Sequence, residues 1–106
     1  MENRAKKIVI ITEKVIAEKV TRIIENAGGT GYTITAADGK GSRGVRTSDH
    51  LSNDSTSNVK IEAIVANTEQ ADRIANEVAS KFFEDYSGIM YALDVEILRP
   101  QKFQKP

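Results

Sequence analysis

The sequence predicts an α+β fold in which a four-stranded antiparallel sheet carries two helices on one of its faces. The order strand, helix, strand occurs twice along 106 residues. Each helical segment has one broad apolar stripe, so each helix needs a sheet to cover. A long polar segment joins the two halves and is too hydrophilic to enter a core. We therefore expect a single domain over residues 1–106, with a polar tail at 101–106 that has no predicted structure.

The first half begins with a strand and a helix. Ala5 to Ile11 ends in four β-branched side chains in a row, which is typical of a central strand covered on both faces. Thr12 is the predicted N-cap of the first helix, which Gly28 ends. A second strand is expected from Tyr32 to Ala37. The apolar positions of the helix follow its 3.6-residue period: Ile16, Val20, Ile23, Ile24 and Ala27.

The segment from Ala37 to Asn58 joins the halves and consists mostly of Gly, Ser, Thr, Asn and Asp. Its first part sets Lys40, Arg43 and Arg46 among three glycines. Glycines allow close approach of a backbone to a ligand, and basic side chains bind phosphate or carboxylate through charge-assisted hydrogen bonds. The alternative is a solvated surface loop whose charges bind nothing, because such loops are a weak signal alone.

The second half repeats the pattern. Val59 to Ala66 alternates as a strand does, and Thr68 is the predicted cap of a helix with an apolar stripe that runs to Phe83. A turn is expected over Asp85 to Gly88. Tyr91 to Leu98 is the predicted last strand, which ends before Pro100.

Two such halves give the order βαββαβ, and the economical packing of this order is the ferredoxin-like arrangement. That arrangement leaves one face of the sheet uncovered, although its strands are rich in β-branched side chains. We therefore expect a closed homo-oligomer in which these faces meet. Aspartate at Ile10 or Val65 is expected to give insoluble or monomeric protein.

Composition narrows the function classes. Fifteen basic and fifteen acidic residues give a net charge of zero, which argues against nucleic acid as a partner. The chain has no cysteine and one histidine, His50, so neither a disulfide framework nor a metal site is expected. The run Ile8 to Ile11 is too short to span a bilayer, and no signal-peptide pattern follows Met1. These features are typical of a cytoplasmic protein.

Two stretches of the sequence resemble the PII signalling superfamily. They are Tyr32-Thr-Ile-Thr-Ala-Ala-Asp-Gly-Lys-Gly-Ser-Arg-Gly-Val-Arg46 and Tyr86-Ser-Gly-Ile-Met-Tyr91. More closely, the chain resembles the PII-like SbtB proteins of cyanobacteria. The resemblance implies a homotrimer that binds adenine nucleotides (AMP, cyclic AMP, ADP and ATP) in inter-subunit clefts. It also implies a T-loop, about Gly39 to Asn58, that docks on a sodium-dependent bicarbonate transporter at the inner membrane, as part of a carbon-concentrating mechanism.

Carried over by position, the resemblance places a nucleotide site at the T-loop base and at the turn Ser87 to Tyr91, where PII proteins have the B-loop. Tyr32 and Tyr91 are candidates for the edges of an adenine pocket, with half-buried packing as the alternative. The B-loop lysine and the T-loop glutamine of energy-sensing PII proteins are both absent, which favours AMP-like ligands, including cyclic AMP, over ATP with magnesium and 2-oxoglutarate. The predicted site residues are Tyr32, Gly39, Lys40, Gly41, Ser42, Arg43, Arg46, Gly88, Ile89, Met90 and Tyr91.

A helical turn at the loop base would point Arg43 and Arg46 to the same side, where both could hold one phosphate. No nucleophile and base pair is visible, so no catalytic residue is expected. Two alternatives stay open on fold analogy. One is a small phosphate-chemistry enzyme, and the other is a trimer of the divalent-cation-tolerance type.

Overall fold

The computed structural model describes residues 3–29, 31–37, 39–41, 44–46 and 57–98. The predicted order of elements and the ferredoxin-like fold are confirmed. The main elements are β1 (Asn3–Glu13), α1 (Ala17–Asn26), β2 (Tyr32–Ala37), β5 (Asn58–Val65), α2 (Thr68–Phe82) and β6 (Gly88–Ile97). A short 3-10 turn, η1 (Lys14–Ile16), precedes α1, and two short strands, β3 (Gly39–Gly41) and β4 (Gly44–Arg46), follow β2. The sheet has the strand order β2-β5-β1-β6, and all neighbours are antiparallel.

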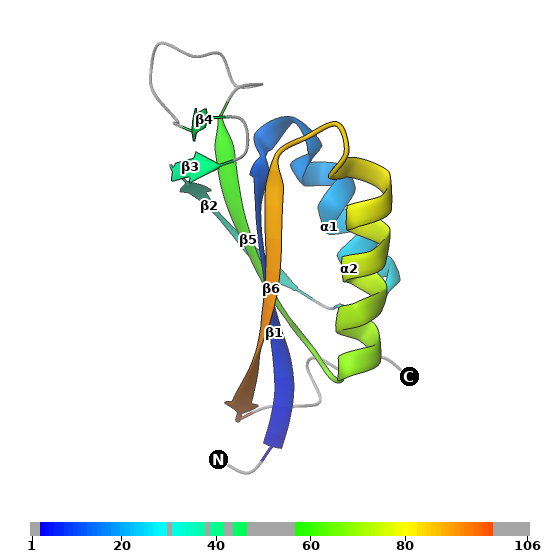
Figure 1. Ribbon diagram of the computed structural model, residues 1–106. Helices are drawn as coiled ribbons and strands as arrows, with labels where there is room; N and C mark the ends of the chain where they lie inside the picture. Colours follow the sequence, from blue (N-terminus) through cyan, green and yellow to red (C-terminus); the bar gives the residue numbers. More distant parts are fainter. Residues whose placement is uncertain (1–2, 30, 38, 42–43, 47–56, 99–106) are drawn as a thin grey trace.

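The molecule has two layers, with both helices on one face of the sheet (Figure 1). Side chains alternate between the two faces of a strand, so every second residue of β1 and β5 enters the core. Ile8 and Ile10 of β1 pack with Ile61 of β5 against Val20 of α1 and Ile74 of α2, and all five side chains are fully buried. Burial of this cluster is the main source of stability.

Ile10 and Val65, where aspartate is expected to give insoluble or monomeric protein, do not lie on the uncovered face. Both side chains are fully buried in the cluster under the helices. A run of β-branched residues places apolar side chains on both faces of the strand. The pattern alone therefore did not tell which of them lie under the helices and which lie on the uncovered face. Ala5 and Val9 are the buried β1 residues of the opposite face, outside the core cluster.

Both predicted helix caps differ from the structure. Thr12 belongs to β1, and its hydroxyl donates a 2.8 Å hydrogen bond to the backbone oxygen of Ser87 instead of capping a helix. The second helix is capped by Asn67, one residue before the predicted Thr68. The side-chain oxygen of Asn67 accepts a 2.9 Å hydrogen bond from the backbone N–H of Gln70. Both types of residue are good caps, so composition did not separate neighbouring candidates.

The last strand begins at Gly88 rather than at Tyr91. It pairs with β1 over its whole length, from Gly88 opposite Thr12 to Ile97 opposite Asn3. The long first strand therefore provides pairing partners for three residues before Tyr91. The segment to which the resemblance assigns a B-loop therefore lies mostly within a strand. Gly88 is also tightly packed, because a Cβ there would lie 2.4 Å from a ring carbon of Phe83.

Gly28 ends α1 as predicted. Its φ of 105° is in the left-handed region that glycine adopts without strain. The backbone N–H of Gly28 donates to the Glu25 oxygen at 3.1 Å, and that of Gly29 donates to the Ile24 oxygen at 2.9 Å. The helix end is thus closed by its own backbone before the chain turns into β2.

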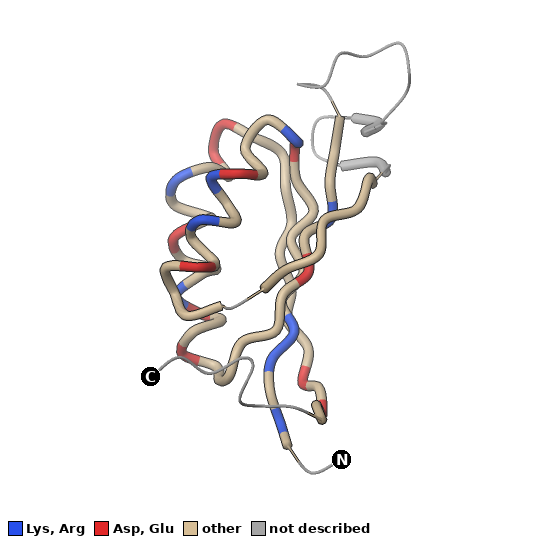
Figure 2. Tube along the Cα trace, turned by 180° about the vertical axis from the view of Figure 1, so that it is seen from behind, with Lys and Arg blue, Asp and Glu red and all other residues tan. Residues whose placement is uncertain are grey.

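Basic and acidic residues are interleaved along the two helices (Figure 2). Two exposed pairs at i,i+4 spacing, Arg22–Glu18 at 2.9 Å and Lys81–Glu77 at 2.7 Å, each contribute about 0.3–0.5 kcal/mol at most. No helix within the described ranges is long and apolar enough to cross a membrane.

Candidate functional site

The sheet face opposite the helices, here called the open face, carries an exposed apolar row on its edge strand. Ile89, Tyr91 and Leu93 of β6 are 54%, 44% and 46% exposed. Residues paired across antiparallel strands point to the same face, so Tyr91 lies beside the buried Val9 of β1. Nothing in the described chain covers this row, so it is a candidate association surface.

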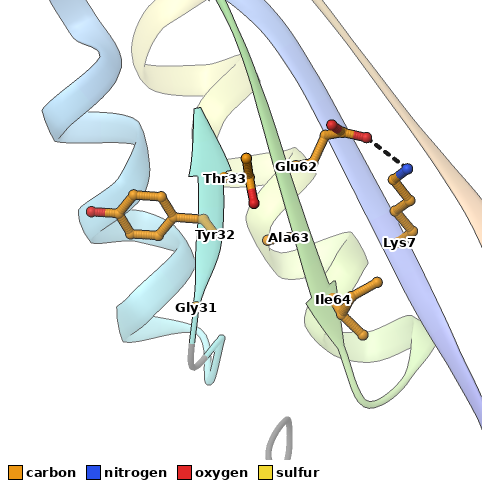
Figure 3. A pocket seen from close by; sticks show the side chains of 7 residues that line it. All are labelled: Lys7, Gly31, Tyr32, Thr33, Glu62, Ala63 and Ile64. Carbon is orange, nitrogen blue, oxygen red and sulfur yellow. Dashed lines mark ion pairs between the residues drawn. The ribbon is translucent and has the colours of Figure 1, made fainter. Parts of the chain in front are cut away.

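The open face also has a cavity of about 420 Å³ between β2, β5 and the neighbouring part of β1. This volume lies in the usual range for small-molecule sites. The cavity is lined by Lys7, Gly31, Tyr32, Thr33, Glu62, Ala63 and Ile64 (Figure 3).

Two charged side chains line this cavity. Lys7 Nζ lies 2.6 Å from Glu62 Oε2, and the side chains are 36% and 26% exposed. The hydrogen bond from Lys7 lowers the pKa of the Glu62 carboxyl below its usual value, with smaller contributions from the positive charges of Lys7 and Lys60. Glu62 is therefore an ionised acceptor at neutral pH, held in place by a fixed donor.

Of the predicted site residues, Tyr32 is the one that lines the cavity in the described part of the chain. Its ring points away from Lys7 and Glu62, toward α1 (Figure 3). This orientation follows from register, because Tyr32 pairs with Ala63, a member of the helix-side core. The next residue, Thr33, pairs with Glu62 and shares its face.

Sequence reasoning missed the other cavity residues. The signal was partly present, because Lys7 directly precedes the apolar run Ile8 to Ile11 and Glu62 lies between two apolar residues of its strand. A charge beside apolar residues of a strand needs solvent, a partner or a ligand. The partner could not be found without knowing that β1 and β5 are neighbours and in which register they pair.

The T-loop base forms a small antiparallel hairpin. Gly39 pairs with Arg46, and Gly41 pairs with Gly44. Ser42 and Arg43 lie outside the described residues. Because Gly44–Arg46 is a strand, the expected helical turn that would align Arg43 with Arg46 is not formed there.

Strand β2 runs from the cavity, which Tyr32 and Thr33 line, toward β3 of this hairpin. Thr33 and Ala37 are on the open face, and four residues of strand separate them by about 13 Å. The order of β2 and β3 along the chain can be followed in Figure 1.

The structure does not bring Tyr32 and Tyr91 together within one chain. They lie on opposite faces of the sheet and on its two edge strands, which are about 14 Å apart. Gly88, Ile89 and Met90 are at the same end of the sheet as the loop base, but across β5 and β1 from it. A site that uses both edges needs a second copy of the chain.

At the end of the sheet beside the T-loop, Glu13 accepts hydrogen bonds from the backbone N–H of Ser87 at 2.6 Å and from its hydroxyl at 3.4 Å. The backbone N–H of Lys14 donates to the Ser57 oxygen at 2.7 Å. Asn58 is 3% exposed, and its side-chain oxygen has no hydrogen-bond partner within the described ranges. The exit of the T-loop is thus fixed to β1, which is fixed in turn to the start of β6.

No group of three or more His, Cys, Asp or Glu side chains within the described ranges is arranged to hold a metal ion. The divalent-cation alternative therefore has no supporting cluster in this part of the molecule.

The sequence profile described as "Nitrogen regulatory protein P-II" matches residues 5–102, nearly the whole chain. The chain belongs to this P-II family.

Solved structures of P-II-like proteins agree with this assignment. CPII of Thiomonas intermedia, described as a nitrogen regulatory PII-like protein bound to ADP, AMP and bicarbonate, is 33% identical, with a TM-score of 0.85 and coverage of 96% of this chain and 95% of CPII. A PII-like signalling protein from Thermus thermophilus is 32% identical, with a TM-score of 0.79 and coverage of 95% and 96%. The ligand-free form of CPII is 27% identical over the aligned part, with a TM-score of 0.66 and coverage of 89% and 91%.

Proposed function

We propose that this P-II protein is a homotrimer that binds adenine nucleotides in inter-subunit clefts and acts on a membrane partner through its T-loop. The observation that carries the proposal is the open-face cavity at Thr33 and Glu62, joined by β2 to the glycine-rich basic loop base. CPII, which this chain resembles over nearly its whole length, is described as bound to ADP and AMP.

In this proposal the base of the nucleotide occupies the cavity. Ile64 offers apolar surface, and Thr33 and Glu62 offer polar groups that orient the base. The phosphates then lie at the loop base. The groups that would meet them there are Gly39, Lys40, Gly41, Ser42, Arg43 and Arg46.

Assembly supplies the rest of the site. The apolar row of Ile89, Tyr91 and Leu93 is the kind of surface that copies of a chain bury when they associate. Gly88 to Tyr91 would then complete the cleft across a subunit boundary, since one chain keeps them far from β2.

The finer proposal follows the resemblance to SbtB proteins. The T-loop, about Gly39 to Asn58, would change order with the bound nucleotide and dock on a sodium-dependent bicarbonate transporter. The protein would then be cytoplasmic and peripheral to the inner membrane through this partner, as a regulator without catalysis. CPII is described with bicarbonate bound, which supports a link to inorganic carbon.

Two measurements test the proposal of a nucleotide-binding homotrimer: light scattering for the assembly, and isothermal titration with AMP, cyclic AMP, ADP, ATP and adenosine for binding. Wild-type protein should have the mass of a trimer and bind the phosphorylated ligands. Thr33→Trp fills the cavity and should weaken AMP at least about tenfold, or about 1.4 kcal/mol. Ser80→Trp, a matched change on exposed α2, should leave binding unchanged. A folded wild-type trimer that binds none of these ligands would refute the proposal.

A separate experiment tests whether the T-loop docks on the transporter. Membranes that contain the bicarbonate transporter should retain the protein, and a version with residues 47–56 replaced by a short Gly-Ser linker should be released. Retention of both versions to the same extent would exclude the T-loop as the docking element.

A further inference from the structure

Two oppositely charged side chains line the cavity, and one is a hydrogen-bond donor while the other is an acceptor. Lys7 offers only donors, and the ionised Glu62 offers only acceptors, 2.6 Å apart. Both belong to the open face, from the middle of the central strand β1 and of its neighbour β5, where the backbone is fixed by pairing on both sides. A planar ligand in the cavity would therefore meet a donor and an acceptor side by side, each on a strand with a fixed backbone (Figure 3).

Purine bases differ at the edge that such a pair would meet. Adenine presents an amino donor at N6 beside the acceptor N7, whereas guanine presents two acceptors, O6 and N7. Glu62 can accept from the N6 amino group while Lys7 donates to N7. Guanine in the same orientation would place its O6 against the carboxylate, where both groups are acceptors. Sites built around a hydrogen-bonding group reject analogues that leave it unpaired.

We propose that the Lys7–Glu62 pair selects adenine over guanine in the open-face cavity. Glu62 reads the amino group, and Lys7 both donates to the ring and positions the carboxylate. This inference rests on the proposed function, because it takes the cavity as the place of the base. It goes further by naming the two residues that determine which purine is accepted.

The chain contains a matched control. Lys6 Nζ and Asp94 Oδ1 form a second ion pair, also at 2.6 Å and also between β1 and a neighbouring strand. Neither residue lines the cavity. Removing that pair takes away a cross-strand ion pair of the same length without changing the groups that line the cavity.

The experiment is calorimetric titration of wild type, Glu62→Gln and Asp94→Asn with AMP and with GMP. Wild type and Asp94→Asn should bind AMP at least about tenfold tighter than GMP. The amide of Glu62→Gln can donate to O6, so its preference for AMP should fall at least about tenfold, mainly through tighter GMP binding. Circular dichroism checks that each variant is folded.

The outcomes separate this inference from the proposed function. Wild type that binds AMP and GMP equally refutes the selection and leaves the nucleotide site standing, whereas wild type that binds neither refutes both. An unchanged ratio in folded Glu62→Gln also refutes the selection. If Glu62→Gln does not fold, Lys7→Met gives the same readout: a preserved ratio refutes the pair as selector, and a ratio reduced at least about fivefold supports it.

Discussion

Glu13 joins the end of β1 to the start of β6 by accepting two hydrogen bonds from Ser87, at 2.6 Å from the backbone nitrogen and 3.4 Å from the hydroxyl. A hydrogen bond to a charged group contributes roughly 1.5–3 kcal/mol. Glu13→Ala should therefore lower the free energy of unfolding by about that amount, measured by urea denaturation. Glu18→Ala removes an exposed helix pair with Arg22 and should cost less than about 0.5 kcal/mol. Equal losses in the two variants would contradict the anchoring role.

Gly88 has no room for a side chain. An added Cβ would meet the ring of Phe83 at 2.4 Å and the hydroxyl of Thr12 at 3.0 Å. Gly88→Ala should destabilise the fold by about 1–3 kcal/mol, as overpacked sites do. Phe83→Leu should relieve part of this loss, so the double variant should be more stable than the sum of the two single effects predicts. Additive losses would show that the ring is not the obstacle.

The open face should hold the assembly together. Leu93→Asp places a charge in the exposed apolar row, and the variant should appear by light scattering as a folded monomer. Val15→Asp is a suitable control, because Val15 is 51% exposed but lies in η1 rather than on that face. A Leu93→Asp protein that remains trimeric would move the interface elsewhere.

The loop arginines should bind phosphate. Arg43→Ala and Arg46→Ala should each weaken AMP and cyclic AMP about tenfold to a hundredfold, because a charge-assisted contact is lost. Adenosine has no phosphate, so its affinity should be the same in wild type and in both variants. If AMP binds all three proteins equally, these arginines are solvated, and the loop base has another role.

Two carboxyl groups should make the free energy of unfolding depend on pH in the acidic range. The pKa of Glu62 is lowered by the hydrogen bond from Lys7, and that of Asp94 by the hydrogen bond from Lys6. A lowered pKa in the folded state means that the stabilisation is complete above the ordinary carboxyl pKa and is lost as pH falls through the folded value. Stability measured with urea should therefore drop as pH falls below the ordinary carboxyl range, about pH 4. In a Glu62→Gln, Asp94→Asn double variant this drop should be smaller, and an identical pH profile would mean that other groups cause it.

Most of the fold could be predicted from the sequence, because hydrophobic periodicity reports which residues are covered. The positions of Val20 and Ile74 in their helices and of Ile61 in its strand follow directly from that period. The start of α1 could not be predicted in this way. Thr12 is as good a cap as it is a strand residue, and its tertiary hydrogen bond to Ser87 decided between them.

One part of the candidate site, the loop base, could be predicted from the sequence, and the other part, the cavity, could not. The loop base with Lys40 and Arg46 is a local pattern, visible in consecutive residues. The cavity is not local, because Lys7 and Glu62 meet only through the register of β1 on β5. A sequence read alone contains the two charges but not the pairing that turns them into one site.

The T-loop leaves and enters the sheet at two residues, Ala37 and Asn58, that are direct partners across β2 and β5. Its ends are therefore held together by the sheet, whatever lies between them, and the entropic cost of closing the loop rises only slowly with length. Doubling the number of residues would cost only about 0.6 kcal/mol. The sequence of this segment can thus change or lengthen, and a reporter peptide can be inserted there, without substitutions in the core. The loop can in this way change its contacts while the sheet that closes its ends stays the same.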